Sequence, residues 1–203
     1  MTCDFQQEKI EEVIRFHGHS CPGLSIGIRA AELAKRELGN LPNSRLVCIT
    51  ETDMCGVDAV QYLTGCTFGK GNLIHRDYGK MAFTFFNRDT GHGFRCLFRP
   101  GEKGDKEGEL TTLFREIASA ASNELEQERN EKLRKKTKAL IMSWDLDALF
   151  EIMEPIEEMP RGARILDSLV CEACGETTME SRTRRYAGRT LCQPCFDKVE
   201  QKT

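Results

Sequence analysis

FHGHSCPG, from Phe16 to Gly23, places two imidazoles and a thiol within five residues: His17, His19 and Cys21. These side chains share an affinity for soft or borderline metal ions. Apolar residues recur at helical spacing on both sides of the loop, and Pro22 suits the first turn of the second helix. We therefore expect Cys21 at a helix N-terminus, where backbone N–H groups and the helix dipole favour a thiolate.

The chain around this loop predicts a mixture of helices and strands. Apolar spacing predicts helices over residues 4–16 and 24–38 and a short one ending at Gly65. LVCIT (46–50) is predicted to be a buried strand, and MAFTFFN (81–87) and FRCLFRP (94–100) to be a hairpin. This order favours an α+β domain with a mostly antiparallel sheet and packed helices.

The second half of the chain predicts a connector. A long helix is expected from Leu110, and beyond Glu126 its charges surround it, which is typical of an exposed helix between modules. Ser143 is expected to cap a further short helix through Met153, and the prolines and charges of residues 154–164 indicate a linker. We predict a core at 1–137, a helical connector and linker at 138–166, and a small domain at 167–203.

Composition excludes several classes of protein. The 203 residues are 39% hydrophobic and 30% charged, and the net charge of −3 gives no general reason to expect a nucleic-acid partner. No apolar run approaches the roughly 20 residues that span a bilayer, and the polar first residues show no secretory signal. We expect a cytoplasmic protein without a membrane partner. In a reducing compartment, its ten cysteines indicate metal ligands or reactive thiols.

Four cysteines near the end of the sequence form two regular pairs. Cys171-x2-Cys174 and Cys192-x2-Cys195 are separated by seventeen residues, the pattern of a four-thiolate structural zinc site in a treble-clef or zinc-ribbon domain. A closed site of this kind leaves no position for catalysis. Arginines give its hairpin a basic rim, either solvated or in contact with an acidic protein or RNA: Arg182, Arg184, Arg185 and Arg189.

Further ligand and acid–base groups follow the loop. Asp53, Cys55 and Asp58 lie where the first strand enters a helix, and Cys66 lies at the end of that helix. Side chains from such segments can converge on one pocket, where imidazole and thiolate would hold a divalent ion. Without an ion, Cys21 or Cys55 beside His19 would be a candidate nucleophile. By itself, Cys66 is equally consistent with an ordinary buried cysteine.

Three motifs resemble one known family: FHGHSCPGLSIGIRAAELA, ETDMCGVDAVQYLTGCTFGKGNL and DYGKMAFTFFNRDTG. They are similar to the core of the FmdE family, a type of formylmethanofuran dehydrogenase subunit. The resemblance implies an α+β core, a homodimer, and a cavity holding a second divalent ion, most simply Zn²⁺. Eight positions match residues that recur in the family, and among these we predict His19, Cys21, Cys55 and Cys66 as metal ligands. The remaining matching positions are candidate catalytic residues: His17, Asp53, Asp58 and Lys70.

Three functions are compatible with these features. The first is an accessory, assembly or metal-handling protein of a molybdenum or tungsten oxidoreductase of C1 metabolism. The sequence shows no pterin site and no ferredoxin-type cysteine run, so the chain is at most a subunit or accessory of such an enzyme. The second is a stand-alone enzyme whose His/Cys-bound ion activates water or a small substrate. The third is a zinc-finger module that binds protein or nucleic acid, which the acidic net charge disfavours.

Overall fold

The computed structural model describes residues 3–42, 45–99, 108–119 and 124–199. The chain divides into two compact units, residues 1–162 and 163–203, which are described separately below. Within the described residues, no helix is long and apolar enough to cross a membrane.

A five-stranded sheet forms the centre of the first unit, with strands in the order β2-β1-β3-β4-β5. Only β1 and β2 are parallel, and every other neighbouring pair is antiparallel. The strands are β1 (Leu46–Thr50), β2 (Leu73–His75), β3 (Ala82–Asn87), β4 (Gly93–Phe98) and β5 (Phe150–Met153). The α+β prediction and the predicted hairpin of β3 and β4 are thereby confirmed. The helix expected up to Met153 is wrong: α6 (Leu146–Leu149) ends early, and pairing with β4 makes the next four residues a strand.

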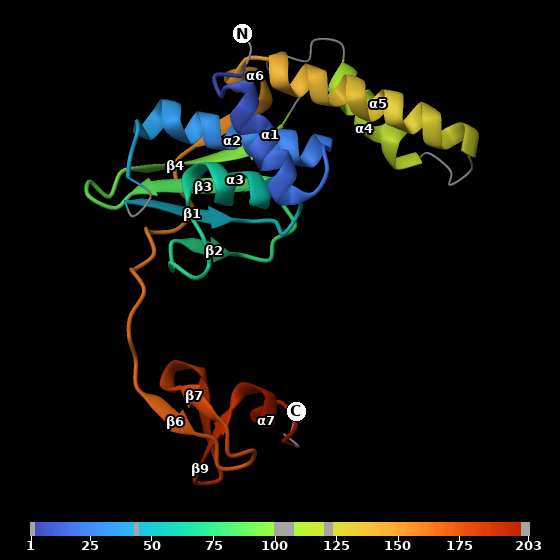
Figure 1. Cartoon of the computed structure of the whole chain (residues 1–203). Coiled ribbons are helices and arrows are strands. Elements are labelled where there is room, and N and C mark those ends of the chain that lie inside the picture. Colours follow the sequence, from blue (N-terminus) through green and yellow to red (C-terminus); the bar gives the residue numbers. More distant parts are fainter. Residues whose placement is uncertain (1–2, 43–44, 100–107, 120–123, 200–203) are drawn as a thin grey trace. The chain divides into compact units, whose positions relative to one another are not determined.

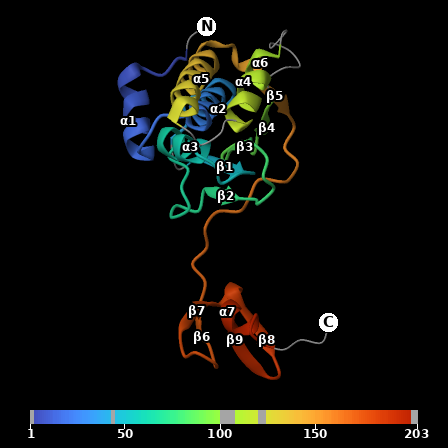
Figure 2. The same ribbon diagram turned by 90° about the vertical axis from the view of Figure 1, so that its right-hand side faces the viewer.

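Two helices cover one face of the sheet, α2 (Pro22–Leu38) and α3 (Gly56–Thr64), and α1 (Gln7–His17) packs on the outer side of these two helices (Figures 1 and 2). Side-chain alternation along the strands explains which face is covered. Cys48, Phe83 and Phe85 point toward the helices and join the main apolar core. Val47 and Ile49 point to the opposite face and form a separate apolar cluster. The predicted helices around the His/Cys loop are confirmed.

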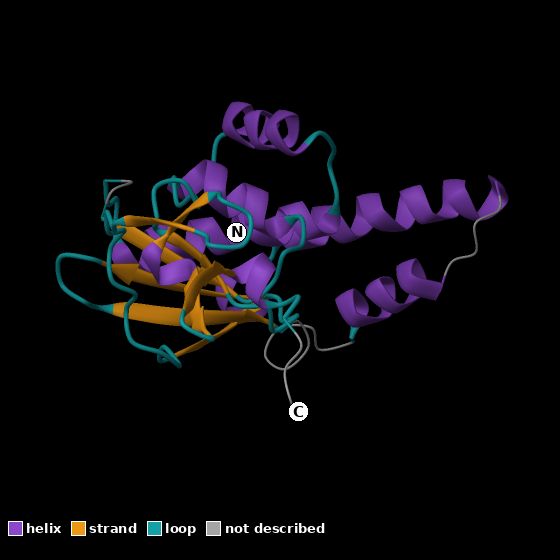
Figure 3. Ribbon diagram, turned by 90° about the horizontal axis from the view of Figure 1, so that it is seen from below, coloured by secondary structure: helices purple, strands orange, loops and turns teal. Residues whose placement is uncertain are grey.

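Two further helices form a hairpin rather than one long connector. α4 (Glu109–Ser119) packs against α5 (Glu124–Ser143), and α5 also packs on α2. Figure 3 shows α4 and α5 running side by side. The ion pair between Lys136 and Glu109, 2.7 Å long, joins the two helices. The prediction of a single exposed helix is wrong, because α5 buries Thr137 and Ile141 against the rest of the unit.

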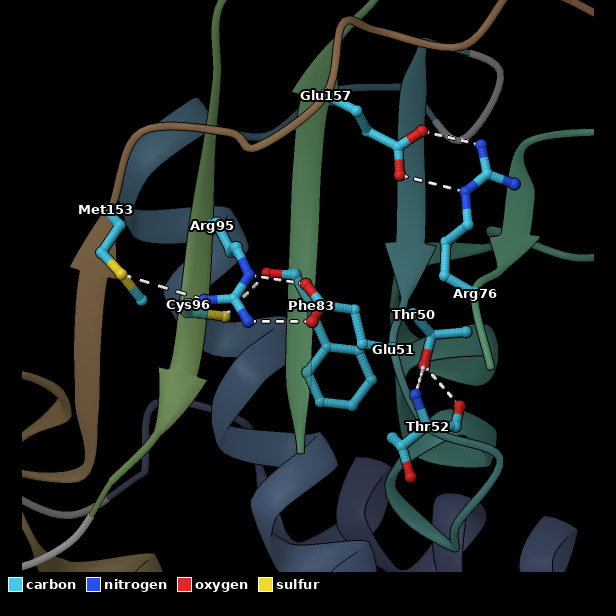
Figure 4. Close-up of polar contacts among 9 residues, drawn as sticks. All are labelled: Thr50, Glu51, Thr52, Arg76, Phe83, Arg95, Cys96, Met153 and Glu157. Carbon is cyan, nitrogen blue, oxygen red and sulfur yellow. Dashed lines mark hydrogen bonds and ion pairs between the residues drawn. The ribbon is translucent and has the colours of Figure 1, made fainter. Parts of the chain in front are cut away.

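The opposite face of the sheet carries polar anchors and a covering segment (Figure 4). Glu51 and Arg95 form a two-contact ion pair of 2.5 and 2.9 Å, with each side chain only 4% exposed. Arg76 binds Glu157 in the same two-contact manner. Residues 154–162 follow β5 across this face, and Met159 packs against the Val47 and Ile49 cluster. This stretch, expected to be a free linker, belongs to the first unit.

The second unit is small and built around two hairpins. β6 (Ser168–Val170) pairs with β7 (Thr177–Met179), and β8 (Thr183–Tyr186) pairs with β9 (Arg189–Cys192). A 3₁₀ turn (Glu180–Arg182) joins the hairpins, and the short helix α7 (Gln193–Phe196) follows β9. Its apolar core is centred on Cys171, Leu191 and Cys192. So little buried apolar surface cannot stabilise a unit of this size without a further cross-link.

Candidate metal centre

The loop between α1 and α2 carries three of the candidate residues. α1 ends at His17, and Gly18 follows with a φ of 90°, a left-handed conformation that glycine adopts without strain. Cys21 is the N-cap of α2, and its Sγ accepts a hydrogen bond from the backbone N–H of Leu24 at 3.3 Å. Pro22 occupies the first turn, so the prediction that Cys21 begins this helix is confirmed.

Cys55 reaches the same place because α2 and α3 cross in very close contact. A Cβ atom added to Gly27 would lie 2.0 Å from the carbonyl oxygen of Gly56, so only glycine permits this approach. Cys55 is the N-cap of α3, and a Cβ atom added to Gly23 near the start of α2 would lie within 4.0 Å of both cysteine sulfurs. The crossing therefore brings the N-termini of two helices together.

Four side chains converge at this point: His17, His19, Cys21 and Cys55. One donor atom from each lies within 4.8 Å of the others. Donors at roughly 2.0–2.3 Å around a tetrahedral zinc ion are about 3.3–3.8 Å apart, so closing the group on an ion requires shifts of about 1 Å. Burial is uneven within the group: Cys21 is buried, His17 and Cys55 are half-buried, and His19 is exposed.

His17 is held in the orientation of a metal ligand. Its Nδ1 lies 2.7 Å from Oδ2 of Asp58, and because a carboxylate only accepts, the imidazole donates this hydrogen bond. Gln61 donates to the other oxygen of Asp58 at 3.4 Å. Nε2 of His17 is buried and has no partner among the described residues. A histidine with one nitrogen bound to a carboxylate and the other unsatisfied fits a divalent ion such as zinc.

The electrostatics of the sulfurs point the same way. Burial raises the pKa of the Cys55 thiol, and the neighbouring Cys21 raises this pKa further through a hydrogen bond and through its charge. Two adjacent thiols therefore resist ionising together unless a positive charge compensates them. A divalent cation supplies that charge, and both helix N-termini add to it.

The other predicted site residues lie outside this group. Cys66 is fully buried in the main core, where its Sγ is 3.5 Å from the carbonyl oxygen of Leu46, and burial raises its pKa to about 11. The structure does not bring Cys66 to the four donors. Lys70 donates to the carbonyl oxygen of Gly65 at the end of α3, and Asp53 is exposed. Of the candidate catalytic residues, only His17 and Asp58 therefore meet.

Some contributors were not found from sequence. Gln61 has the i, i+3 spacing from Asp58 that could have identified it as a partner on the same helix face. Lys138 of α5 donates to the Ser20 hydroxyl beside His19 at 2.9 Å. No sequence signal could have found this contact, because the two residues meet only through the packing of α5 on α2.

The second unit places its four cysteines as the spacing predicts: Cys171, Cys174, Cys192 and Cys195. One sulfur from each lies within 4.8 Å of the others. The backbone N–H of Cys192 donates to Sγ of Cys171 at 3.3 Å. This contact, with the neighbouring N–H groups of Cys174 and Ala173, lowers the pKa of Cys171 to about 6. The neighbouring sulfurs raise the pKa of Cys195 to about 12, so the four groups ionise together only when a cation compensates them, and a tetrahedral structural zinc ion would do so.

Comparison with protein-family models gives two matches. The model described as "FmdE, Molybdenum formylmethanofuran dehydrogenase operon" matches residues 16–151. The model described as "Prokaryotic dksA/traR C4-type zinc finger" matches residues 164–201. Together with the geometry of the four sulfurs, the second match supports a structural zinc ion in the second unit.

Two individual proteins are similar over most of the chain. A probable S-adenosyl-L-methionine-binding protein of Archaeoglobus fulgidus is 32% identical over 83% of the chain. The chain spans about half the length of this curated relative, 48%. The crystal structure of an FmdE-like protein of the tungsten formylmethanofuran dehydrogenase type, from Syntrophus aciditrophicus, superposes with a TM-score of 0.62 at 25% identity. The superposition covers 94% of this chain and 91% of the solved one.

Proposed function

We propose that this chain, which belongs to the FmdE family, is a metal-binding accessory protein of a molybdenum or tungsten oxidoreductase. In this proposal, His17, His19, Cys21 and Cys55 hold a divalent ion in the first unit. The zinc ion of the second unit is structural. The oxidoreductase link is supported by the names of the family and of the Syntrophus protein, both of which include formylmethanofuran dehydrogenase.

The proposal depends most on how the fold holds the His17 side chain, which is oriented to bind an ion through Nε2. Its Nδ1 is fixed by Asp58 while its buried Nε2 has no described partner, and two sulfurs lie beside it at helix N-termini. A bound cation would polarise any further group that coordinates it, and its charge would neutralise the thiolates of Cys21 and Cys55. Asp58 would keep the proton on Nδ1, which leaves the Nε2 lone pair for the ion.

A stand-alone enzyme is the second candidate. Asp58 favours it, because the carboxylate side chain is 40% exposed and beside His17, where it could accept a proton from a bound substrate. The number of donors disfavours it. With all four donors bound, two imidazoles and two thiolates complete a tetrahedron, whereas catalytic zinc sites have only three protein ligands and keep the fourth position open at rest. The accessory function therefore fits the geometry better.

The remaining parts of the proposal concern compartment and assembly. Ten cysteines without a disulfide suit a cytoplasmic protein. We also propose that the chain forms a homodimer, which the resemblance to the family implies. The binding of S-adenosyl-L-methionine named for the Archaeoglobus relative is not extended to this chain, which spans only 48% of that protein.

Native purification from the source organism tests the accessory function. We expect the tagged chain to co-elute with a molybdenum- or tungsten-containing oxidoreductase. A variant with Cys55→Ser should recover less of that enzyme, or an enzyme with lower metal content, while Cys3→Ser, outside the four-donor group, serves as the matched control. Recovery without any oxidoreductase, together with metal-dependent turnover by the isolated chain, would favour the stand-alone enzyme.

A further inference from the structure

The four donors of the core site differ in how firmly the fold holds them. Cys21 is fixed by its N-cap hydrogen bond, and Cys55 is fixed by the close crossing at Gly27 and Gly56. His17 has a side chain only 10% exposed and is hydrogen-bonded to Asp58. Each of these three donors is therefore placed before an ion arrives.

His19 is the exception. It is exposed, and it lies in the four-residue loop 18–21 between α1 and α2. Among the described residues, its ring forms no hydrogen bond, and its one ring contact is with His17, centroid to centroid 4.4 Å. Gly18 has no neighbour within 4 Å of where a Cβ would lie, so nothing covers this side of the loop. Metal-bound histidines are normally held through their second nitrogen, and His19 lacks that support.

From this asymmetry we propose that His19 is the exchangeable ligand of the core site, which leaves to admit an incoming thiolate. The inference rests on the proposed function, since it assumes that the four donors hold an ion. An exchangeable ligand would allow a site with four protein donors to take up and release its metal ion. His19 withdraws one lone pair and the thiolate supplies another, so no oxidation or reduction is involved.

The charge around the loop selects the incoming donor. α2 and α3 both begin at the site, and the positive dipole ends of these helices favour negative charge there. Lys138 adds a cation 2.9 Å from the Ser20 hydroxyl, next to His19. Asp58 opposes this field, but its carboxylate is already engaged by His17 and Gln61. Together with the affinity of borderline ions for sulfur, this field favours a thiolate over a neutral donor.

Zinc release to a coloured chelator tests the proposal in the full chain. Two kinetic phases are expected, and the one absent from Cys55→Ser belongs to the core. We expect His17→Ala to lose the core ion. His19→Ala and His19→Gln should keep it at saturating zinc but release it about tenfold faster or more. Near-UV circular dichroism establishes that each variant is folded.

Added thiol provides the second readout. 2-Mercaptoethanol should accelerate the core phase of the wild-type protein in proportion to its concentration, whereas 2-(methylthio)ethanol, which forms no thiolate, should leave the rate unchanged. Reduced glutathione identifies the source of the donor. Acceleration by 2-mercaptoethanol alone indicates that the site admits only a small thiol, and acceleration by both indicates that it also has room for a cysteine within a peptide.

Two results separate failure of this inference from failure of the proposed function. If folded His19→Ala loses the core ion as completely as His17→Ala, or if thiols leave the wild-type core phase unchanged, His19 is not the exchangeable ligand. If the wild-type protein holds a single ion that disappears in Cys192→Ser, the core site itself is absent and the proposed function fails with it.

Discussion

Substituting Gly27 with alanine should separate the two helices that build the core site. The new Cβ would lie 2.0 Å from the carbonyl oxygen of Gly56 and 2.6 Å from two further backbone atoms of that residue. Ordinary contact requires about 3.5 Å, so the helices must move apart by more than 1 Å. The obstacle is backbone and cannot rotate away.

The cost follows from packing. Overfilling a packed interior typically costs 1–3 kcal/mol, and a clash with backbone places Gly27→Ala near the upper end, about 3 kcal/mol. For a chain of this size, that loss lowers the melting temperature by about 6–12 °C. Because Cys21 and Cys55 begin the two helices that separate, the variant should also lose the core ion and keep the zinc of the second unit.

Differential scanning calorimetry and elemental analysis measure both effects. Gly69→Ala is the matched control, since no atom lies within 4 Å of its new Cβ, and its unfolding free energy should change by at most about 0.5 kcal/mol. The reasoning is refuted if Gly27→Ala melts at the temperature of Gly69→Ala and binds the same number of ions.

Three further predictions concern charges. Asp58→Asn should weaken ion binding at the core about 10–100-fold, because it removes the carboxylate that holds His17. Asp53→Asn, at an exposed position, should leave the affinity unchanged. Isothermal titration calorimetry with Zn²⁺ measures both affinities, and equal values would contradict the role of Asp58. Acidification should release the core ion, because the raised pKa of Cys55 lets protons compete with the ion for its sulfur. The affinity for Zn²⁺ should fall by about tenfold per pH unit for each proton taken up. An affinity that does not change between pH 8 and pH 6 would show that Cys55 is not a ligand. Glu51→Gln should destabilise the first unit by about 3 kcal/mol, because it leaves Arg95 buried without its counter-charge. Glu151→Gln, in the more exposed pair with Arg99, should cost less than about 1 kcal/mol. Equal losses of unfolding free energy in urea would refute this difference.

Much of the fold was predictable because local signals and tertiary packing agree. Leu46–Thr50 combines an apolar run with buried positions, and the hairpin after it has turn residues between two apolar strands. β5 was not predictable, because Phe150–Met153 is four residues long, follows a helix directly, and becomes a strand only by pairing with β4. The α4–α5 hairpin was missed for a similar reason: the charges of α5 hide Thr137 and Ile141, which are fully buried.

The candidate site was predictable in part. The spacing of His17, His19 and Cys21 within one loop predicts a shared location, and Cys55 was assigned with them because it follows a strand end. The sequence analysis separated metal ligands from catalytic residues, but the structure does not: His17, which was assigned to acid–base chemistry, lies among the metal donors. Cys66, assigned as a ligand, lies in the core. What decides between these cysteines is the close crossing of α2 and α3, which no local pattern reveals.

Elemental analysis of natively purified protein tests the central claim most directly, comparing wild type with Cys55→Ser and Cys192→Ser. Two separate ions predict about two metal equivalents per chain in the wild type, with one lost in each variant and both lost in the double variant. A wild-type content of one equivalent that Cys55→Ser leaves unchanged would contradict the claim that the helix N-termini hold an ion.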